Sequence, residues 1–207
     1  MQSTLIERSP RTRAEFLTAF GRPLQRISVE QYHQMIDAGV FSNGEKCELI
    51  RGVLLEKPVP KPPHSYTVDV LSDLLRELVG AGFVVRTQQP VTMGDSEPEP
   101  DVVVAHGTRR DYKSKHPGPS DVAILVEVAD ASVRDDRTTK LTMYAEAGVS
   151  TYWIVDLKAR TVVVFTLPRG GRKPGYRKAS AFQAGDQLPL VLGGKRIGFI
   201  SVDDILP

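Results

Sequence analysis

The sequence has one cysteine, Cys47, among 207 residues. A single thiol excludes an internal disulfide framework and any zinc site built from several cysteines. No apolar run approaches the roughly 20 residues of a membrane-spanning helix, and the N-terminal segment MQSTLIERSPRTRAEF lacks the apolar core of a signal peptide. We therefore expect a cytoplasmic protein in which Cys47 is a small buried side chain rather than a reactive thiol.

The sequence patterns of several common enzyme classes are absent. There is no GxGxxG, Walker, HExxH or nucleophile-elbow pattern, which excludes nucleotide-binding, zinc-protease and serine-hydrolase functions of those types. The net charge of +2 at pH 7 neither requires nor excludes a nucleic acid partner. Basic residues do gather in three segments, which could contact a phosphate backbone or simply be solvated. These segments contain Arg8, Arg11, Arg13, Arg22 and Arg26, then Arg109, Arg110, Lys113 and Lys115, and finally the stretch from Arg169 to Lys178.

The composition is that of an ordinary globular protein. Hydrophobic residues make up 41% of the chain and charged residues 25%, which suits one domain with a real core. Residues 1–26 show no sustained apolar period, so we expect an N-terminal arm there. Residues 27–207 are expected to form a single domain.

Local patterns predict the first elements. Ser28 and Gln31 form a capping-box pattern for a helix that ends at Gly39. The segment CELIRGVLLEK predicts two short strands joined at Arg51–Gly52. A proline-rich connector then leads into a helix over residues 64–82, which has a stripe of apolar side chains.

A strand-rich section follows. We expect strands over 83–93, 101–105, 122–129, 151–156 and 161–166, and an irregular loop over 106–120. Ser132 can cap a helix from about Val133 to Ala147, and the chain after Gly170 is expected to form loops and short strands. A strand–helix–strand crossover between 122–129 and 151–156 implies a parallel pair. The fold class is therefore α/β, a mixed sheet flanked by helices.

Acidic residues that interrupt apolar runs are candidates for a functional site. Glu127 lies within the apolar strand ILVEV, Asp101 opens the strand DVVVA, and Glu48 begins the strand before Ile50. A buried carboxylate must be paired, protonated or metal-bound. Two converging carboxylates can hold Mg²⁺ or Mn²⁺, and a lysine such as Lys140 can stabilise the transition state of phosphodiester hydrolysis. Salt-bridged structural acids are the alternative interpretation.

The same residues resemble a known pattern. Pro100–Asp101, followed by Glu127 in a hydrophobic strand, resembles the PD-(D/E)XK nuclease superfamily. More narrowly, five segments together are similar to the bacterial family called Uma, described as "putative restriction endonucleases". They are CELIRGVLL, the helix beginning at His64, EPEPDVVVA, ILVEVADAS and KLTMYAEAGVSTYWIVD, and the similarity spans from about residue 29 to residue 166.

The resemblance implies a restriction-endonuclease-like nuclease domain over 27–207 and metal-dependent cleavage of DNA. Asp101 and Glu127 correspond to the acids that hold Mg²⁺ or Mn²⁺, and Glu48 to the family's early glutamate. The motif's lysine is a departure, because Ala129 stands at its place; Lys140 on the next helix is the expected substitute. Asp130 is a second departure, where the resemblance leads us to expect serine.

Three further residues are candidates for supporting roles. His64 either only bonds locally at a helix start or acts in catalysis. Gln89, or its neighbour Gln88, could bind a phosphate or water. Tyr144, one helical turn past Lys140, either packs in the core or orients that lysine.

Three functions remain open from the sequence: a metal-dependent DNA endonuclease, a catalytically inactive relative that binds nucleic acid, and an interaction protein with structural acids. A single site cuts one strand per engagement, so cutting a duplex through both strands requires two sites. We therefore expect a homodimer. The apolar segments LIRGVLL and TVVVFT have no obvious helical cover and are candidates for its interface.

Overall fold

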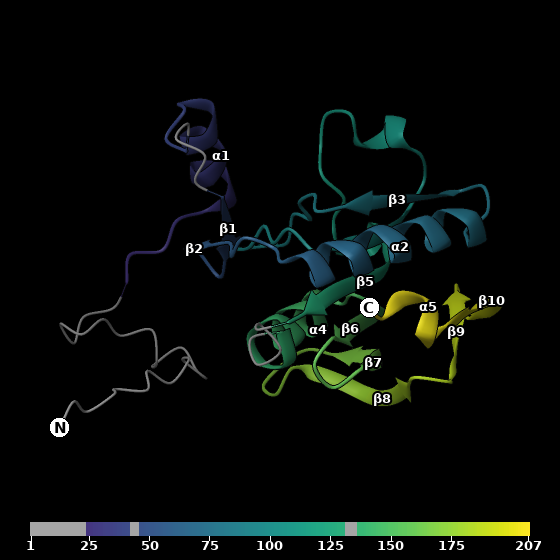
Figure 1. Cartoon of the computed structure of the whole chain (residues 1–207). Coiled ribbons are helices and arrows are strands. Elements are labelled where there is room, and N and C mark those ends of the chain that lie inside the picture. Colours follow the sequence, from purple (N-terminus) through teal and green to yellow (C-terminus); the bar gives the residue numbers. More distant parts are fainter. Residues whose placement is uncertain (1–23, 42–45, 131–135) are drawn as a thin grey trace, which may run out of the picture.

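The computed structural model describes residues 24–41, 46–130 and 136–207 (Figure 1). The expected N-terminal arm therefore lies almost wholly outside the described residues, as do four of its arginines and the expected helix cap Ser132. None of the described helices combines the length and apolar character needed to cross a membrane.

A six-stranded mixed sheet forms the centre of the molecule. Its strands follow the order β3-β4-β5-β6-β7-β8. Only β5 and β6 pair in parallel, which confirms the crossover predicted from the sequence. The strands are β3 (Phe83–Thr87), β4 (Val102–His106), β5 (Val122–Ala129), β6 (Thr151–Asp156), β7 (Thr161–Arg169) and β8 (Gly175–Gln183).

Helices cover both faces of this sheet. Side chains alternate along each strand, so neighbouring residues of one strand pack against different helices. On one face, Val102 and Val104 of β4 belong to a core cluster with Leu71 of helix α2 (Pro62–Leu78). On the other face, Val103 belongs to a second cluster with Met143 of helix α4 (Leu141–Ala147). A π-helix, η4 (Asp136–Lys140), leads directly into α4. Every residue of β5 is buried, as expected for a central strand covered on both faces.

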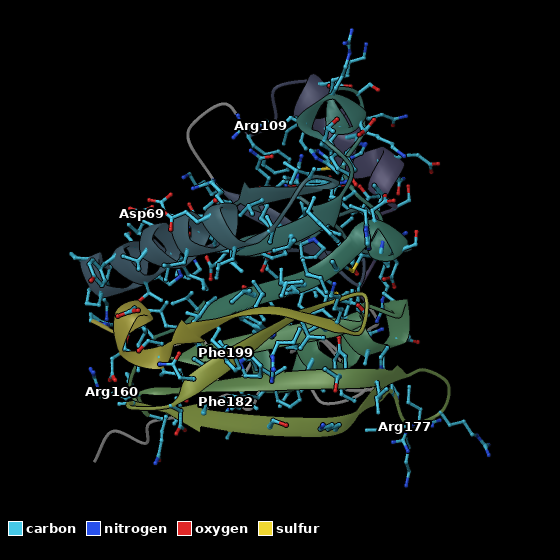
Figure 2. The ribbon with its side chains drawn as sticks, turned by 90° about the vertical axis from the view of Figure 1, so that its right-hand side faces the viewer. Asp69, Arg109, Arg160, Arg177, Phe182 and Phe199 are labelled. Carbon is cyan, nitrogen blue, oxygen red and sulfur yellow. The ribbon has the colours of Figure 1, made fainter. Side chains whose placement is uncertain are left out.

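Smaller elements surround the sheet (Figures 1 and 2). The hairpin β9–β10 adds apolar side chains to the α2 face of the core, among them Leu188, Leu190 and Ile200. The β1–β2 turn requires glycine at position 52, because φ is +75° and a Cβ there would lie 2.8 Å from the Cβ of Arg26. The elements are α1 (Val29–Asp37), β1 (Cys47–Ile50), β2 (Val53–Glu56), η2 (Arg109–Tyr112), η3 (Pro119–Asp121), β9 (Gln187–Leu192), β10 (Lys195–Ser201) and α5 (Val202–Ile205).

The structure confirms the capping box of α1, in which Ser28 Oγ accepts from Gln31 N and Gln31 Oε1 accepts from Ser28 N. Other details differ from the predictions. Helix α2 begins at Pro62, because proline suits the first helical turn. Strand β3 ends at Thr87, since Gln88 adopts φ +48°. Cys47 is only partly buried.

The sequence predicted TVVVFT as a strand with no obvious helical cover and as a candidate for the dimer interface. It is not an edge strand. These residues form β7, which pairs with β6 on one side and β8 on the other. The segment after Gly170 therefore contains a nine-residue strand, β8, and a second hairpin rather than loops and short strands. The loop over 106–120 likewise contains two short helical turns, η2 and η3. The segment LIRGVLL forms the separate β1–β2 hairpin.

Candidate active site

Asp101 and Glu127 are brought together by the pairing of β4 with β5. The register places Val102 opposite Val126, so Asp101, one residue earlier, stands beside Glu127, one residue later. The backbone N–H of Val128 donates to Asp101 Oδ2 at 2.8 Å, which fixes the aspartate against the strand that carries Glu127. Both carboxylates are buried, with residue exposures of 8% and 4%.

Glu127 points toward α4, as do Leu125 and Ala129 at alternate positions of β5. Its Oε1 atom accepts hydrogen bonds from Lys140 Nζ at 3.1 Å and from Tyr144 Oη at 2.8 Å. The two donors are four residues apart and therefore lie on one face of the helical segment. Complete burial raises the pKa of the Tyr144 phenol well above its ordinary value, so the hydroxyl remains protonated and can donate.

Glu48 contacts the same lysine. Strand β1 places its buried carboxylate with Oε1 3.4 Å from Lys140 Nζ. Its Oε2 atom accepts from the backbone N–H of Glu99. The ammonium of Lys140 thus lies between two buried carboxylates, Glu48 and Glu127, at the junction of η4 and α4.

His64 lies against Asp101 from the first turn of α2. Its Nε2 atom is 3.2 Å from Asp101 Oδ2, and because an ionised carboxylate only accepts, Nε2 carries the proton. This hydrogen bond is the largest effect on the imidazole and raises its pKa above 6.5, although burial acts in the opposite direction. The other ring nitrogen, Nδ1, is buried and has no hydrogen-bond partner within the described segments.

Two other sequence candidates, Gln89 and Asp130, form no hydrogen bond or ion pair with the side chains of Asp101 or Glu127 among the contacts found in the described residues. Gln89 is exposed on the chain after β3, and none of the hydrogen bonds found among the described residues joins its side chain to the acids. Asp130 forms an ion pair with Lys61 at 3.4 Å. For Tyr144 the sequence predicted either packing in the core or a hydroxyl that orients Lys140. In the structure this side chain is packed in the core, and its hydroxyl donates to Glu127.

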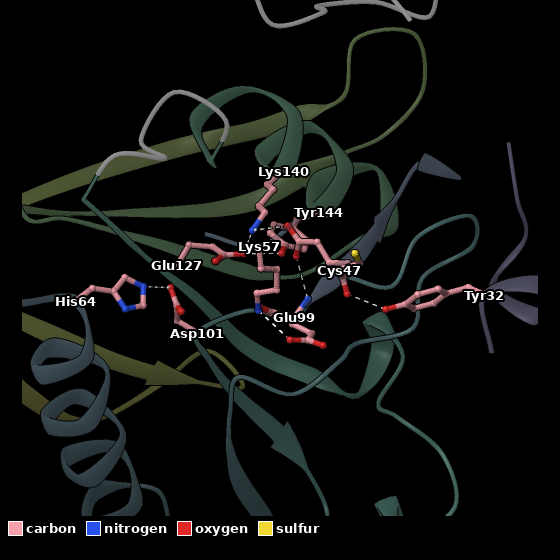
Figure 3. Close-up of polar contacts among 10 residues, drawn as sticks. Tyr32, Cys47, Lys57, His64, Glu99, Asp101, Glu127, Lys140 and Tyr144 are labelled. Carbon is pink, nitrogen blue, oxygen red and sulfur yellow. Dashed lines mark hydrogen bonds and ion pairs between the residues drawn. The ribbon is translucent and has the colours of Figure 1, made fainter. Parts of the chain in front are cut away.

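Two groups of polar contacts escaped the sequence analysis. Lys57 Nζ lies 2.9 Å from Glu99 Oε2, beside the catalytic candidates in Figure 3. Farther along, the buried carboxylate of Glu97 contacts His33 at 2.8 Å and Thr92 at 2.6 Å. The signal was present in the segment EPEPD, because its acids recur at every second position, as side chains on one face of an extended chain do.

The donor set fits a hard divalent cation. Mg²⁺ typically uses one or two protein carboxylates and keeps several waters, and Mn²⁺ also favours oxygen ligands. Asp101 Oδ1 accepts no hydrogen bond from the described residues and is available as a ligand atom. Those residues include no cluster of three or more His, Cys, Asp or Glu side chains arranged to hold a metal ion. A cation here would take Asp101 and Glu127 as ligands and complete its shell with water or phosphate oxygens.

Comparison with known families identifies the family of this chain. A family model described as "Uma2: Putative restriction endonuclease" matches residues 29–197. The chain belongs to the Uma2 family. The match includes Glu48, His64, Asp101, Glu127 and Lys140, and it extends past the segments recognised from sequence through β8 to β10.

A solved structure has the same fold as this Uma2 protein. It is described as "a putative nuclease belonging to DUF820" from Anabaena variabilis, with a TM-score of 0.59 over 78% of this chain and 90% of that chain. At 16% identity the likeness shows the shared fold alone, which confirms the predicted mixed α/β sheet. No curated protein matches the chain.

The His64–Asp101 contact of this Uma2 protein predicts a measurable titration. Because the folded-state pKa is raised, the stability contributed by the pair is complete below the ordinary pKa of about 6.5 and is lost as pH rises through the raised value. A ¹H NMR titration in EDTA should therefore give His64 a pKa above its ordinary value. Asp101→Asn should lower that pKa. A His64 pKa unchanged by the substitution would contradict the contact.

Proposed function

We propose that this protein is a metal-dependent endonuclease that hydrolyses phosphodiester bonds in DNA. One observation carries the proposal: two buried carboxylates, Asp101 and Glu127, meet on adjoining strands, with the ammonium of Lys140 3.1 Å from the second. Family membership supports a nuclease in general. We infer the requirement for Mg²⁺ or Mn²⁺ from the donor set, and the choice of DNA from the description of the family as restriction endonucleases.

Each residue has a distinct role in this proposal. Asp101 and Glu127 would hold the cation, which when bound lowers the pKa of its water and neutralises charge on the phosphoryl oxygens. Lys140 provides a fixed positive charge that can position the attacking water and stabilise the negative charge that develops. Tyr144 orients Glu127, His64 orients Asp101, and Glu48 keeps Lys140 in place.

The placement of Lys140 favours an active enzyme over an inactive relative. The lysine position of the motif is occupied by Ala129, a loss that alone would suggest a protein that binds without cutting. However, the chain returns after β5 through η4, and Lys140 contacts the same glutamate from the helix side. The charge is therefore supplied from a different element of the fold.

Removal of either acid should abolish metal-dependent cleavage. Asp101→Asn and Glu127→Gln each remove a carboxylate ligand, so the rate of nicking of supercoiled plasmid in Mg²⁺ or Mn²⁺ should fall by more than the about 10–100-fold typical of residues that only orient a ligand. Thermal unfolding in EDTA is the control, and both variants should remain folded. Nicking at the wild-type rate by either variant would remove that residue from the site.

Loss of the lysine should separate metal binding from catalysis. Lys140→Ala should lose most cleavage activity while still binding Mn²⁺ in calorimetric titrations, because the ammonium acts on water and phosphate rather than on the cation. Tyr144→Phe is the matched variant, since it removes the other donor to Glu127 but leaves the ammonium in place. Cleavage by Lys140→Ala at the wild-type rate would show that the lysine of the motif has not moved to this helix.

We further propose that double-strand cleavage requires a homodimer, since each chain has one such site. Within the described residues the central sheet ends at β3 and β8, and β2 is the outer strand of its hairpin. Exposed strand edges of this kind are where a second copy can pair. The mass in solution, measured by light scattering, decides the point; a single-chain mass would predict nicking only.

A further inference from the structure

The β7–β8 hairpin lies in a part of the chain that contains no acidic residue. Between Asp156 and Asp186 there is no aspartate or glutamate, although the whole chain carries a net charge of only +2. The basic residues in this interval are Lys158, Arg160, Arg169, Arg172, Lys173, Arg177 and Lys178. Positive charge is therefore concentrated on one supersecondary unit.

Five of these cations gather around the turn between β7 and β8, and we call them the cationic tip: Arg169, Arg172, Lys173, Arg177 and Lys178. All five are exposed. Within the described part of the chain, no carboxylate forms an ion pair with any of them. Several other basic side chains do form such pairs. Arg51, in the turn after β1, pairs with Glu146, Arg76 of α2 pairs with Asp73, and Arg137 of η4 pairs with Asp156.

The tip is held in a defined position. Arg169 Nε–H donates to the carbonyl of Lys173 across the turn at 3.2 Å. At the start of β8, Tyr176 Oη donates to the carbonyl of Val149 at 2.9 Å, just after α4. Figure 2 shows Arg177 projecting outward at one end of the hairpin, with Arg160 at the other.

A continuous series of aromatic contacts connects the tip with the candidate active site. Tyr176 stacks on Tyr152 with ring centroids 6.2 Å apart, and Tyr152 meets the edge of Tyr144 at 5.0 Å. Tyr144 in turn donates to Glu127. Closely packed side chains do not deform freely. These contacts therefore fix the position of the tip relative to the carboxylate of Glu127.

We propose that the cationic tip binds the phosphate backbone of the DNA duplex that is cut at Asp101 and Glu127. The inference rests on the proposed nuclease function and names the element that holds its substrate. Unpaired, exposed Lys and Arg side chains bind phosphates by releasing condensed counterions, and such contacts position a duplex without reading its sequence. Proteins that bind single strands present exposed aromatic rings for stacking. The aromatic ring beside the tip, Tyr176, is instead partly buried and packed against the core, so the tip favours duplex over single-stranded DNA.

The test compares the wild-type protein with two variants that each lose three positive charges. The tip variant is Arg172→Gln, Lys173→Gln and Arg177→Gln; it spares Arg169, which closes the turn. The control variant is Lys158→Gln, Lys195→Gln and Arg196→Gln, which removes the same charge from before β7 and from the start of β10. Binding of a fluorescein-labelled duplex of two helical turns is measured in EDTA, so that no cleavage occurs, over about 50–200 mM potassium chloride.

We expect the tip variant to bind the duplex more than about tenfold more weakly, with the slope of log affinity against log salt reduced by about 3, or about 0.9 for each lost phosphate contact. The control variant should change that slope by less than about 1. Equal slopes for the two variants would overturn the proposal, and so would wild-type binding to phosphatidylserine vesicles with none to the duplex.

The same titration separates this inference from the proposed catalysis. Asp101→Asn should bind the duplex with the wild-type salt slope and fail to cut it. If the wild-type protein binds through the tip but cuts nothing in Mg²⁺ or Mn²⁺, the binding role of the tip is supported and the nuclease proposal is contradicted.

Discussion

The carboxylate of Glu127 within a fully buried strand is the constraint on which the site depends. An ionised group in that environment is stable only when it is paired and fully hydrogen-bonded. Lys140 and Tyr144 meet this requirement from one helical segment, and both donate to the same oxygen. The position of the helical segment that carries Lys140 and Tyr144 therefore depends on the side chain of Glu127. The π-helical turn that delivers Lys140 is consistent with this, because such turns are frequent at functional sites.

Asp101 depends on the same strand through a different set of contacts. Its Oδ2 atom accepts from the backbone of β5 and contacts His64 on α2, so a central strand and a helix that covers the sheet meet at this carboxylate. Each acid is thus oriented by a neighbour that is not itself a proposed metal ligand. Partners of this kind fix the geometry of a metal site before the cation arrives. In the structure, Lys140 contacts the carboxylate of Glu127, and His64 contacts the carboxylate of Asp101.

The sequence was sufficient where local patterns coincide with the fold. The unbroken apolar run of β5 predicted a central strand, its crossover predicted the parallel partner β6, and an acid inside the run marked the site. The sequence did not predict features that depend on pairing between segments distant in the chain. Strand β8 has a largely exposed, basic sequence without an apolar period, so nothing local showed that it covers β7. In the same way, only the fold shows that Glu48 faces Lys140, more than ninety positions later in the chain.

The central claim is that Asp101 and Glu127 form one cation site beneath Lys140. The most direct measurement is the anomalous diffraction of Mn²⁺ in crystals of the wild-type protein. The account predicts a single strong peak bound by oxygens of both Asp101 and Glu127, and the loss of that peak in Glu127→Gln crystals grown and soaked in the same way. A Mn²⁺ peak bound elsewhere, or no peak between these carboxylates in a well-ordered crystal, would contradict it.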